Sequence, residues 1–185
     1  MISLHRQHVD RFLASAIPAD DGLRGLHIGC GAGDRGRYRP SPRQHWTAVD
    51  LAHGPLRADI LALPFRTASF DIVRATEMLY FLGVREITGA LSECRRVLKH
   101  GGRFVATVPL LVPPISAADQ VRITPEGWRA IMPFWDPRIT PLGGYWTHLV
   151  TTLEHLSRGF VVLRPLARFD DPAAYPHALG LTGVR

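Results

Sequence analysis

The chain has 185 residues, of which 46% are hydrophobic and 21% charged, as in an ordinary soluble globular protein of one domain. This length suffices to bury a core without disulfides or metals, and the composition excludes an intrinsically disordered chain. The formal net charge of +6 raises the question of nucleic-acid binding, but Lys99 is the only lysine and the arginines are scattered without interleaved aromatic residues. This distribution argues against a nucleic-acid partner and favours an anionic substrate or peripheral contact with a membrane surface.

Membrane spans and cysteine frameworks are not expected. No apolar run reaches the roughly 18 residues that a membrane span needs, and charged residues interrupt the N-terminal segment where a signal peptide would be apolar. We therefore expect a cytoplasmic protein with no transmembrane segment. Cys30 and Cys94 are too few and too differently placed for a disulfide framework or a metal site, so we expect reduced thiols and no metal. The sequence does not indicate an oligomeric state.

The first half of the chain alternates between helix and strand patterns. Apolar residues on one helical face predict an amphipathic helix over residues 4–17, which Pro18 would end. Short apolar runs predict strands over residues 26–28, 46–49, 58–60 and 70–74. The arginines and prolines of residues 35–42 predict a short or irregular connection after the first strand.

The second half continues this alternation. Apolar spacing predicts a helix over residues 87–98 and a strand over residues 103–108. Thr124, as an N-cap followed by proline, predicts a helix over residues 125–134. The remaining expected elements are a strand over residues 137–142, a helix over residues 143–160 and a loose tail beyond Pro172. Strands and helices in alternation predict a parallel sheet covered by helices.

The stretch LHIGCGAGDRG at residues 26–36 predicts a turn that binds a ligand. A buried strand leads into glycines at alternate positions, which allow positive φ angles and let a ligand approach the backbone. Gly31, Gly33 and Gly36 fit the pattern G-x-G-x-x-G of dinucleotide sites, whereas Gly29, Gly31 and Gly33 fit the tighter G-x-G-x-G of nucleoside-binding methyltransferases. The stretch alone leaves both interpretations open.

Two acids follow the next two predicted strands. Asp50 ends the second strand and Asp59 the third, and ligands in open parallel sheets lie at the carboxyl ends of the strands. Asp50 can accept hydrogen bonds from both hydroxyls of a ribose, Leu51 can cover an adenine face, and Asp59 can accept from the adenine amino group. Each acid alone could be a cap or turn residue, but their joint placement favours a nucleoside site.

Residues 26–109 contain a recognisable order of motifs: LHIGCGAG, AVDL, ADILALPF, SFDIVRATEMLYFL and ECRRVLKHGGRFVATVP. In this order they resemble the class I S-adenosylmethionine-dependent methyltransferases, of the small bacterial type 11. The resemblance implies an α/β fold, a Rossmann-like three-layer sandwich with a mostly parallel central sheet in a single domain. It divides that domain into an N-terminal helix (1–22), a cofactor-binding core (23–112), an acceptor-side segment that completes the sheet (113–170) and the tail (171–185).

The resemblance implies S-adenosyl-L-methionine as cofactor and assigns residues to its parts. It implies that Gly29, Cys30, Gly31 and Gly33 contact the methionine and ribose parts and that Asp50 binds the ribose hydroxyls. Leu51 and Ile60 would flank the two faces of adenine, and Asp59 would bind its amino group. Ala75 and Thr76 would lie near the methionyl amine. Two places differ from the family pattern. His27 stands where many members have an acid, and Tyr80 and Phe81 stand where an acid–histidine pair often follows the retained Glu77.

The distal run DQVRITPEGWRAIMPFW, followed by PLGGYW, is similar to a region of methyltransferases linked with bacterial polysaccharide or lipid-linked sugar pathways. The matching positions are Asp119, Arg122 and Thr124. Without a binding role, these residues would form a buried turn and a capped helix. The tryptophans of this region could stack on a sugar or fill the core.

These features support three hypotheses of function. The first is O-methylation by in-line transfer to a small-molecule, sugar or lipid-linked acceptor, with His148, Tyr145 and Tyr80 as candidate bases. The second is an NAD-dependent oxidoreductase, which the run GAGDRG supports, although the chain has no substrate domain for it. The third, suggested by His27 and the altered loop at Phe81, is a partner protein that binds the cofactor without turnover.

Overall fold

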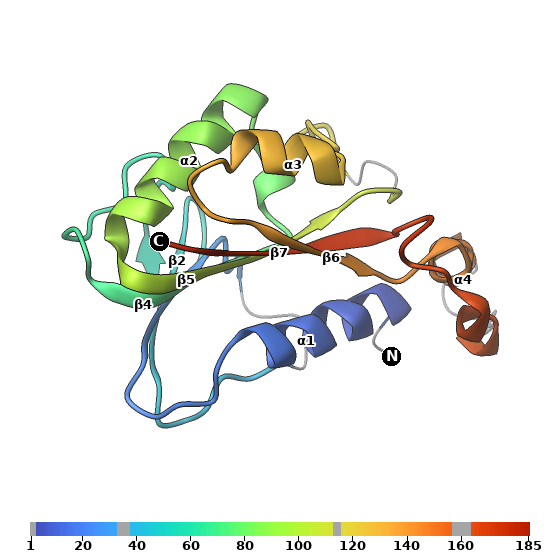
Figure 1. Ribbon diagram of the computed structural model, residues 1–185, viewed down its shortest axis with the longest axis horizontal. Coiled ribbons are helices and arrows are strands. Elements are labelled where there is room, and N and C mark those ends of the chain that lie inside the picture. Colours follow the sequence, from blue (N-terminus) through green and yellow to red (C-terminus); the bar gives the residue numbers. More distant parts are fainter. Residues whose placement is uncertain (1–2, 33–37, 113–115, 157–163) are drawn as a thin grey trace.

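The computed structural model describes residues 3–32, 38–112, 116–156 and 164–185 (Figure 1). The strands are β1 Arg24–Ile28, β2 His45–Asp50, β3 Leu56–Arg57, β4 Phe70–Thr76, β5 Leu98–Pro109, β6 Arg138–Leu142 and β7 Ala178–Val184. The helices are α1 Leu4–Ala16, α2 Val84–Val97, α3 Pro125–Ile131 and α4 Tyr145–Leu156, with 3-10 turns η1 Leu79–Phe81 and η2 Arg164–Phe169. The predicted irregular connection after the first strand falls partly on residues 33–37, outside this description.

All seven strands form one sheet in the order β3-β2-β1-β4-β5-β7-β6. Strands β1 to β5 pair in parallel, and β7 pairs antiparallel with both β5 and β6. The sheet is therefore mostly parallel, which confirms the predicted α/β fold. The carboxyl ends of β1, β2, β4 and β5 lie along one edge, because Ile28 pairs with both Val49 and Ala75, and Thr76 pairs with Thr107.

Helices cover both faces of the sheet. Figure 1 shows α2 and α3 on one face, α1 on the other, and α4 beyond one end of the strands. Helix α2 turns an apolar stripe to the sheet, as its sequence predicts, with Ile87, Leu91 and Cys94 buried. Helix α1 packs Phe12 and Leu13 into a second, smaller core on the opposite face. The arrangement is a three-layer sandwich.

The C-terminal segment forms part of the sheet, so the expectation of a loose tail is wrong. Strand β7 lies between β5 and β6; it pairs with β5 along its whole length and with β6 over residues 178–182. A Cβ at Gly180 would lie 2.5 Å from the Phe12 ring, and one at Gly183 would lie 2.9 Å from Cβ of Trp135. The glycines that weaken the strand pattern in the sequence are therefore the residues that let these aromatic rings approach the backbone.

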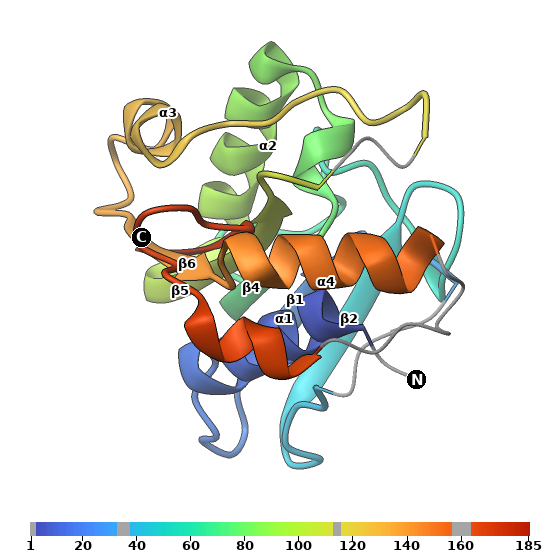
Figure 2. The same ribbon diagram turned by 90° about the vertical axis from the view of Figure 1, so that its right-hand side faces the viewer.

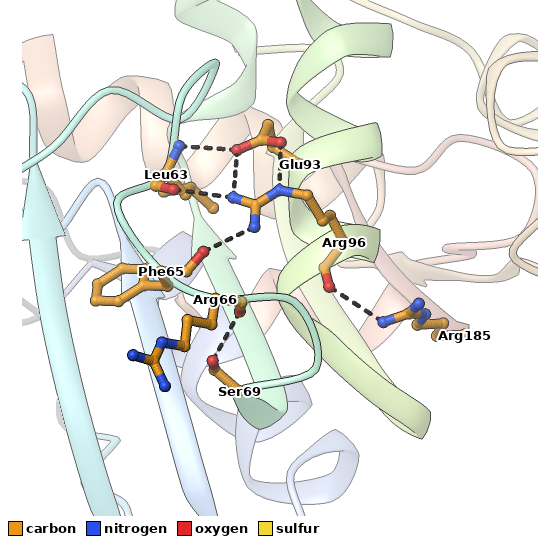
Figure 3. Close-up of polar contacts among 7 residues, drawn as sticks. All are labelled: Leu63, Phe65, Arg66, Ser69, Glu93, Arg96 and Arg185. Carbon is orange, nitrogen blue, oxygen red and sulfur yellow. Dashed lines mark hydrogen bonds and ion pairs between the residues drawn. The ribbon is translucent and has the colours of Figure 1, made fainter.

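The loop after Asp59 is fixed to α2 by Arg96 (Figure 3). Its guanidinium donates to the Glu93 carboxylate at 2.7 and 2.8 Å and to the backbone oxygens of Phe65 at 2.7 Å and Leu63 at 2.9 Å. The Glu93 carboxylate also accepts from the Leu63 N–H at 2.9 Å. The predicted third strand over residues 58–60 is instead the shorter β3 at residues 56–57, followed by an isolated bridge from Asp59 to Ala62.

No helix among the residues described is both long and apolar enough to cross a membrane.

Candidate cofactor and acceptor site

The glycine turn after β1 exposes its backbone at the carboxyl edge of the sheet. Gly29 has φ +71° and Gly31 φ +60°, a region that favours glycine. A Cβ at Gly29 would lie 2.7 Å from Cβ of Met78, so the turn touches the segment that follows β4. No atom of the described residues lies within 4 Å of a Cβ placed at Gly31, so these residues leave the space in front of Gly31 open. The turn thus offers a backbone surface that a ligand can approach, and Gly33 lies outside the described residues.

Asp50 connects the ends of β1 and β2. Its Oδ2 accepts from the Gly31 N–H at 2.9 Å, and its Oδ1 accepts from the Ala52 and His53 N–H groups at 3.0 Å. Partial burial alone would raise the pKa of Asp50, but these backbone donors and the nearby His53 bring it below the usual value. The ionised carboxylate has further lone pairs that suit ribose hydroxyls. Beside it, the apolar Leu51 side chain is 71% exposed, as a residue that covers an adenine face would be.

The other cofactor candidates differ in how accessible they are. Asp59 follows β3 at the same edge, where its Oδ1 accepts from the Leu61 N–H at 2.9 Å. Ile60 packs in the core with 5% exposure, and Ala75 is fully buried in β4. The Thr76 hydroxyl at the end of β4 is buried and has no hydrogen-bond partner among the described residues. The Cys30 side chain is half-buried, and a Cβ at Gly54 would lie 2.6 Å from its Sγ.

His27 stands where many family members have an acid, and here it contacts Arg74. It lies beside the buried Arg74, with the guanidinium NH2 at 3.0 Å from Nδ1 and 3.1 Å from Nε2. The same guanidinium lies 5.6 Å from the Tyr38 ring and 5.8 Å from the Trp46 ring. His27 therefore lies in a contact between the Arg74 guanidinium and the rings of Tyr38 and Trp46, on the face of the sheet that α1 covers.

Two of the three candidate bases lie in settings poorly suited to proton abstraction. Tyr145 is 54% exposed and packs edge-on against Trp146. Burial, together with the charges of Glu77 and Asp119, raises the pKa of Tyr80 to about 12, so its hydroxyl stays protonated. The Arg122 guanidinium lies 5.3 Å from the Tyr80 ring.

Arg122 itself anchors the segment before α3. Its guanidinium makes a bidentate ion pair with Asp119 and donates to the Val112 backbone oxygen at 3.1 Å. The Thr124 hydroxyl caps α3 by accepting from the Gly127 N–H at 3.2 Å. These contacts have the character of the buried turn and capped helix that the sequence left as the alternative to a binding role. Trp128 and Trp135 fill the core.

His148, the third candidate base, lies beside a group of residues that are far apart in the sequence. His177 before β7 is its neighbour, and His5 at the start of α1 and Glu77 after β4 continue the group from His177. His5 Nε2 lies 3.2 Å from Glu77 Oε2, and His5 Nδ1 lies 3.1 Å from His177 Nε2. The rings of His148 and His177 are 5.6 Å apart. We call these four residues the histidine cluster.

The helices that carry the cluster are held at their N-terminal ends. Ser3 caps α1 by accepting from the Arg6 N–H at 3.3 Å. Asp170, at the end of η2, accepts from the Gly144 N–H at 2.9 Å and the Thr147 N–H at 3.0 Å and so caps α4. Figure 1 shows the N-terminal end of α1 and helix α4 at the same end of the sheet, and Figure 2 shows α4 crossing in front of α1. These caps fix where the histidines of both helices lie.

Comparison with known proteins places this geometry in a class. Residues 26–106 match a family described as "Methyltransferase domain". A malonyl-[acyl-carrier protein] O-methyltransferase of Enterobacter lignolyticus is 30% identical over 141 residues, which cover 69% of this chain and 52% of that protein. The chain spans about half the length of the curated relatives it matches.

Solved structures share the fold across nearly the whole chain. A S-adenosylmethionine-dependent methyltransferase from Archaeoglobus fulgidus superposes with a TM-score of 0.63 at 16% identity, covering 97% of this chain and 94% of that one. Phosphoethanolamine N-methyltransferase 2 from Haemonchus contortus, in complex with S-adenosyl-L-methionine, gives 0.64 at 16% identity, covering 97% and 52%.

The fold, the glycine turn and the acid after β2 are those of the class I S-adenosylmethionine-dependent methyltransferases. The matched segment, residues 26–106, belongs to the methyltransferase-domain family, as the resemblance of its motifs predicts. The dinucleotide interpretation of Gly31, Gly33 and Gly36 gains no support from these comparisons.

Proposed function

We propose that this protein transfers the methyl group of S-adenosylmethionine to a hydroxyl of a small-molecule, sugar or lipid-linked acceptor. The hydrogen bond from the Gly31 N–H to the Asp50 carboxylate carries the cofactor part of this proposal, because it joins the open glycine turn to an ionised acid at one sheet edge. Gly29, Cys30, Gly31, Ala75 and Thr76 would form the methionine and ribose side. Leu51 and Asp59, with Ile60 behind them, would form the adenine side.

The bound cofactor supplies a methyl group already activated on a sulfonium sulfur. The residues of the chain then have to orient the acceptor in line with that methyl, exclude water and remove the hydroxyl proton. The end of β4 suits the reacting region, because Thr76 and Glu77 directly follow the buried part of the strand, next to the glycine turn. We found no group of three or more His, Cys, Asp or Glu side chains suited to a metal among the residues that the structure describes.

Calorimetry with S-adenosylmethionine, S-adenosylhomocysteine and NAD tests the cofactor assignment. We expect the two adenosyl ligands to bind below millimolar concentration, and Asp50→Ala to weaken them at least tenfold, about 1.4 kcal/mol. Asp21→Ala is the matched control, because Asp21 is an exposed acid that pairs with Arg43 at 2.9 Å, on the turn that leads into β1. NAD binding alone, or equal affinities for wild type and Asp50→Ala, would contradict the proposal.

Transfer is tested with radiolabelled S-adenosylmethionine and a panel of hydroxylated sugars, lipids and aromatic compounds, with products identified by mass spectrometry. We expect a methyl ether in at least one of these classes. Binding of the cofactor without transfer to any of them would favour a partner protein that lacks turnover.

A further inference from the structure

The histidine cluster contains a hydrogen-bonded chain whose protons can be assigned. Burial alone would raise the pKa of Glu77, but the hydrogen bond and charge of His5, together with the Thr107 hydroxyl and Arg6, bring it below the usual value. The Glu77 carboxylate can then only accept, so His5 Nε2 carries the proton of their 3.2 Å contact. When His5 is neutral, its Nδ1 accepts, and His177 then donates from Nε2 across 3.1 Å.

This assignment leaves a lone pair on Nδ1 of His177, at the far end of the series of hydrogen bonds. His177 is 1% exposed, and its Nδ1 is buried with no hydrogen-bond partner among the described residues. His148 Nδ1 and the Thr151 hydroxyl, both on α4, are also buried without a hydrogen-bond partner among the described residues. Native structures pair almost all buried polar atoms, and unpaired ones commonly serve a ligand or a reaction.

The backbone at this place is also unusual. Glu77 has φ +53°, the left-handed region that a residue with a side chain rarely adopts. Its N–H donates to the Thr107 backbone oxygen at 3.0 Å, which holds Glu77 against the end of β5. Strain of this kind persists where the surroundings require it and is concentrated at functional sites. Here it turns the carboxylate towards His5.

We propose that His177 is the catalytic base for the methyl acceptor, and that His5 and Glu77 are positioning residues that take up the resulting charge. The inference rests on the proposed function and assigns the residue that removes the proton of the acceptor hydroxyl. An acceptor that is already ionised, such as a carboxylate, needs no such base.

Methyl transfer through this cluster moves two protons and one methyl group. The acceptor proton goes to His177 Nδ1, the Nε2 proton of His177 moves to His5 Nδ1, and His5 keeps its Nε2 proton against Glu77. The acceptor oxygen forms its bond to the methyl carbon, the carbon–sulfur bond breaks, and its electron pair stays on sulfur. The excess positive charge ends on His5, where the Glu77 carboxylate stabilises it.

The surrounding charges favour this direction of transfer. Burial, and then the charges of His5 and His148, lower the pKa of His177 to about 3, while Glu77 opposes them. His177 is therefore neutral at pH 7 and cannot keep a positive charge. Beside the cluster on α1, His8 lies 3.2 Å from the Thr147 hydroxyl, and burial with the charge of Arg11 also lowers the pKa of His8.

The test uses the intact protein, with its imidazoles observed by long-range ¹H–¹⁵N correlation NMR. The probes are S-adenosylhomocysteine and sinefungin, an analogue with an amino group near the position of the reactive methyl. We expect His177 to be a neutral Nε2–H tautomer that stays unprotonated down to roughly pH 5, well above its pKa of about 3. Sinefungin should shift the His177 signals relative to S-adenosylhomocysteine, while the exposed His100 at the start of β5 should not change.

A His177 that is protonated at neutral pH, or that carries its proton on Nδ1, would overturn the proposal. So would bound sinefungin that leaves His177 unchanged. If neither analogue binds, the cofactor assignment itself fails, which is a separate result.

Two variants probe the chain of hydrogen bonds. Glu77→Gln should change the His5 and His177 signals and, with an acceptor found by the transfer assay, lower kcat at least tenfold. It should also move the acid limb of the pH profile to lower pH, because the charged imidazole loses its carboxylate partner. Asp71→Asn is the control, since Asp71 is a half-buried acid paired with Lys99 at 2.7 Å near the other end of the strands. Equal effects of the two variants would indicate a merely structural role for Glu77.

Discussion

Alanine substitutions at three glycines with positive φ distinguish the effects of backbone strain, of packing and of ligand approach. Gly22, Gly29 and Gly31 have φ of +76°, +71° and +60°, so alanine is strained at each. That strain costs about 1 kcal/mol, after part of it is offset by the lower entropy of the unfolded chain. The three sites differ in what a Cβ would meet, which gives each substitution its own expected result.

Gly22→Ala should show the strain alone, because no atom in the described part of the chain lies within 4 Å of its Cβ position and the turn precedes β1, away from the glycine turn. Gly29→Ala adds contacts at 2.7 Å to Cβ and Cγ of Met78, and overpacking of this kind costs a further 1–3 kcal/mol, or roughly 2–4 kcal/mol in total. Gly31→Ala should lose about as much stability as Gly22→Ala. Its methyl would enter the open space in front of the turn, so the Kd for S-adenosylhomocysteine should rise at least tenfold, about 1.4 kcal/mol.

Urea unfolding of the free variants measures the first effect, and calorimetry with S-adenosylhomocysteine measures the second. The reasoning is refuted if Gly31→Ala binds as tightly as wild type, because the turn would then not face the cofactor. It is also refuted if Gly22→Ala weakens binding as much as Gly31→Ala, since strain alone would then explain the loss.

Two further predictions concern buried charge. The pKa of His177 falls to about 3 on folding, so between that value and about 6.5 only the unfolded state binds its proton, and stability is lost as the pH falls through this window. Between pH 7 and pH 4.5, the free energy of unfolding of His177→Gln should therefore fall by roughly 2–3 kcal/mol less than that of wild type, as measured by urea unfolding. Equal losses of stability in the two proteins would contradict the burial argument. Arg122→Ala takes the guanidinium from the buried Asp119 carboxylate and should cost roughly 3 kcal/mol, whereas Arg129→Ala removes an exposed pair with Glu126 and should cost less than about 0.5 kcal/mol. Similar losses for the two arginine variants in urea unfolding would show that burial of the first pair is unimportant.

Local patterns in the sequence predicted most of the elements that surround the cofactor side. The apolar stripe of α2, the capped start of α3 and the first two strands depend on residues close together in the chain, and they form where expected. Strand β7 was missed because Gly180 and Gly183 weaken its pattern. Only the packing of Phe12 and Trp135 shows why glycine is needed there.

On the acceptor side, too, local sequence patterns did not predict which residues come together. His148 is a lone histidine on an amphipathic helix, and no local pattern joins it to residues at both ends of the chain. Pairing with His177 brings residue 5 of the first helix to residue 177 before the last strand, 172 positions apart. The only trace in the sequence is Glu77, retained where the family pattern has an acid, and its role depends on what the fold places beside it.

The sequence by itself determined the class of protein and the order of the cofactor motifs. Each of those motifs is a short run at the end of a strand, where glycine conformation, burial and an adjacent carboxylate are set by near neighbours. The tertiary structure decided how the sheet is completed and which side chains share the acceptor edge. Those contacts join segments that are distant in the chain, and their geometry exists only after the antiparallel β7 has entered the sheet and brought His177 to His5.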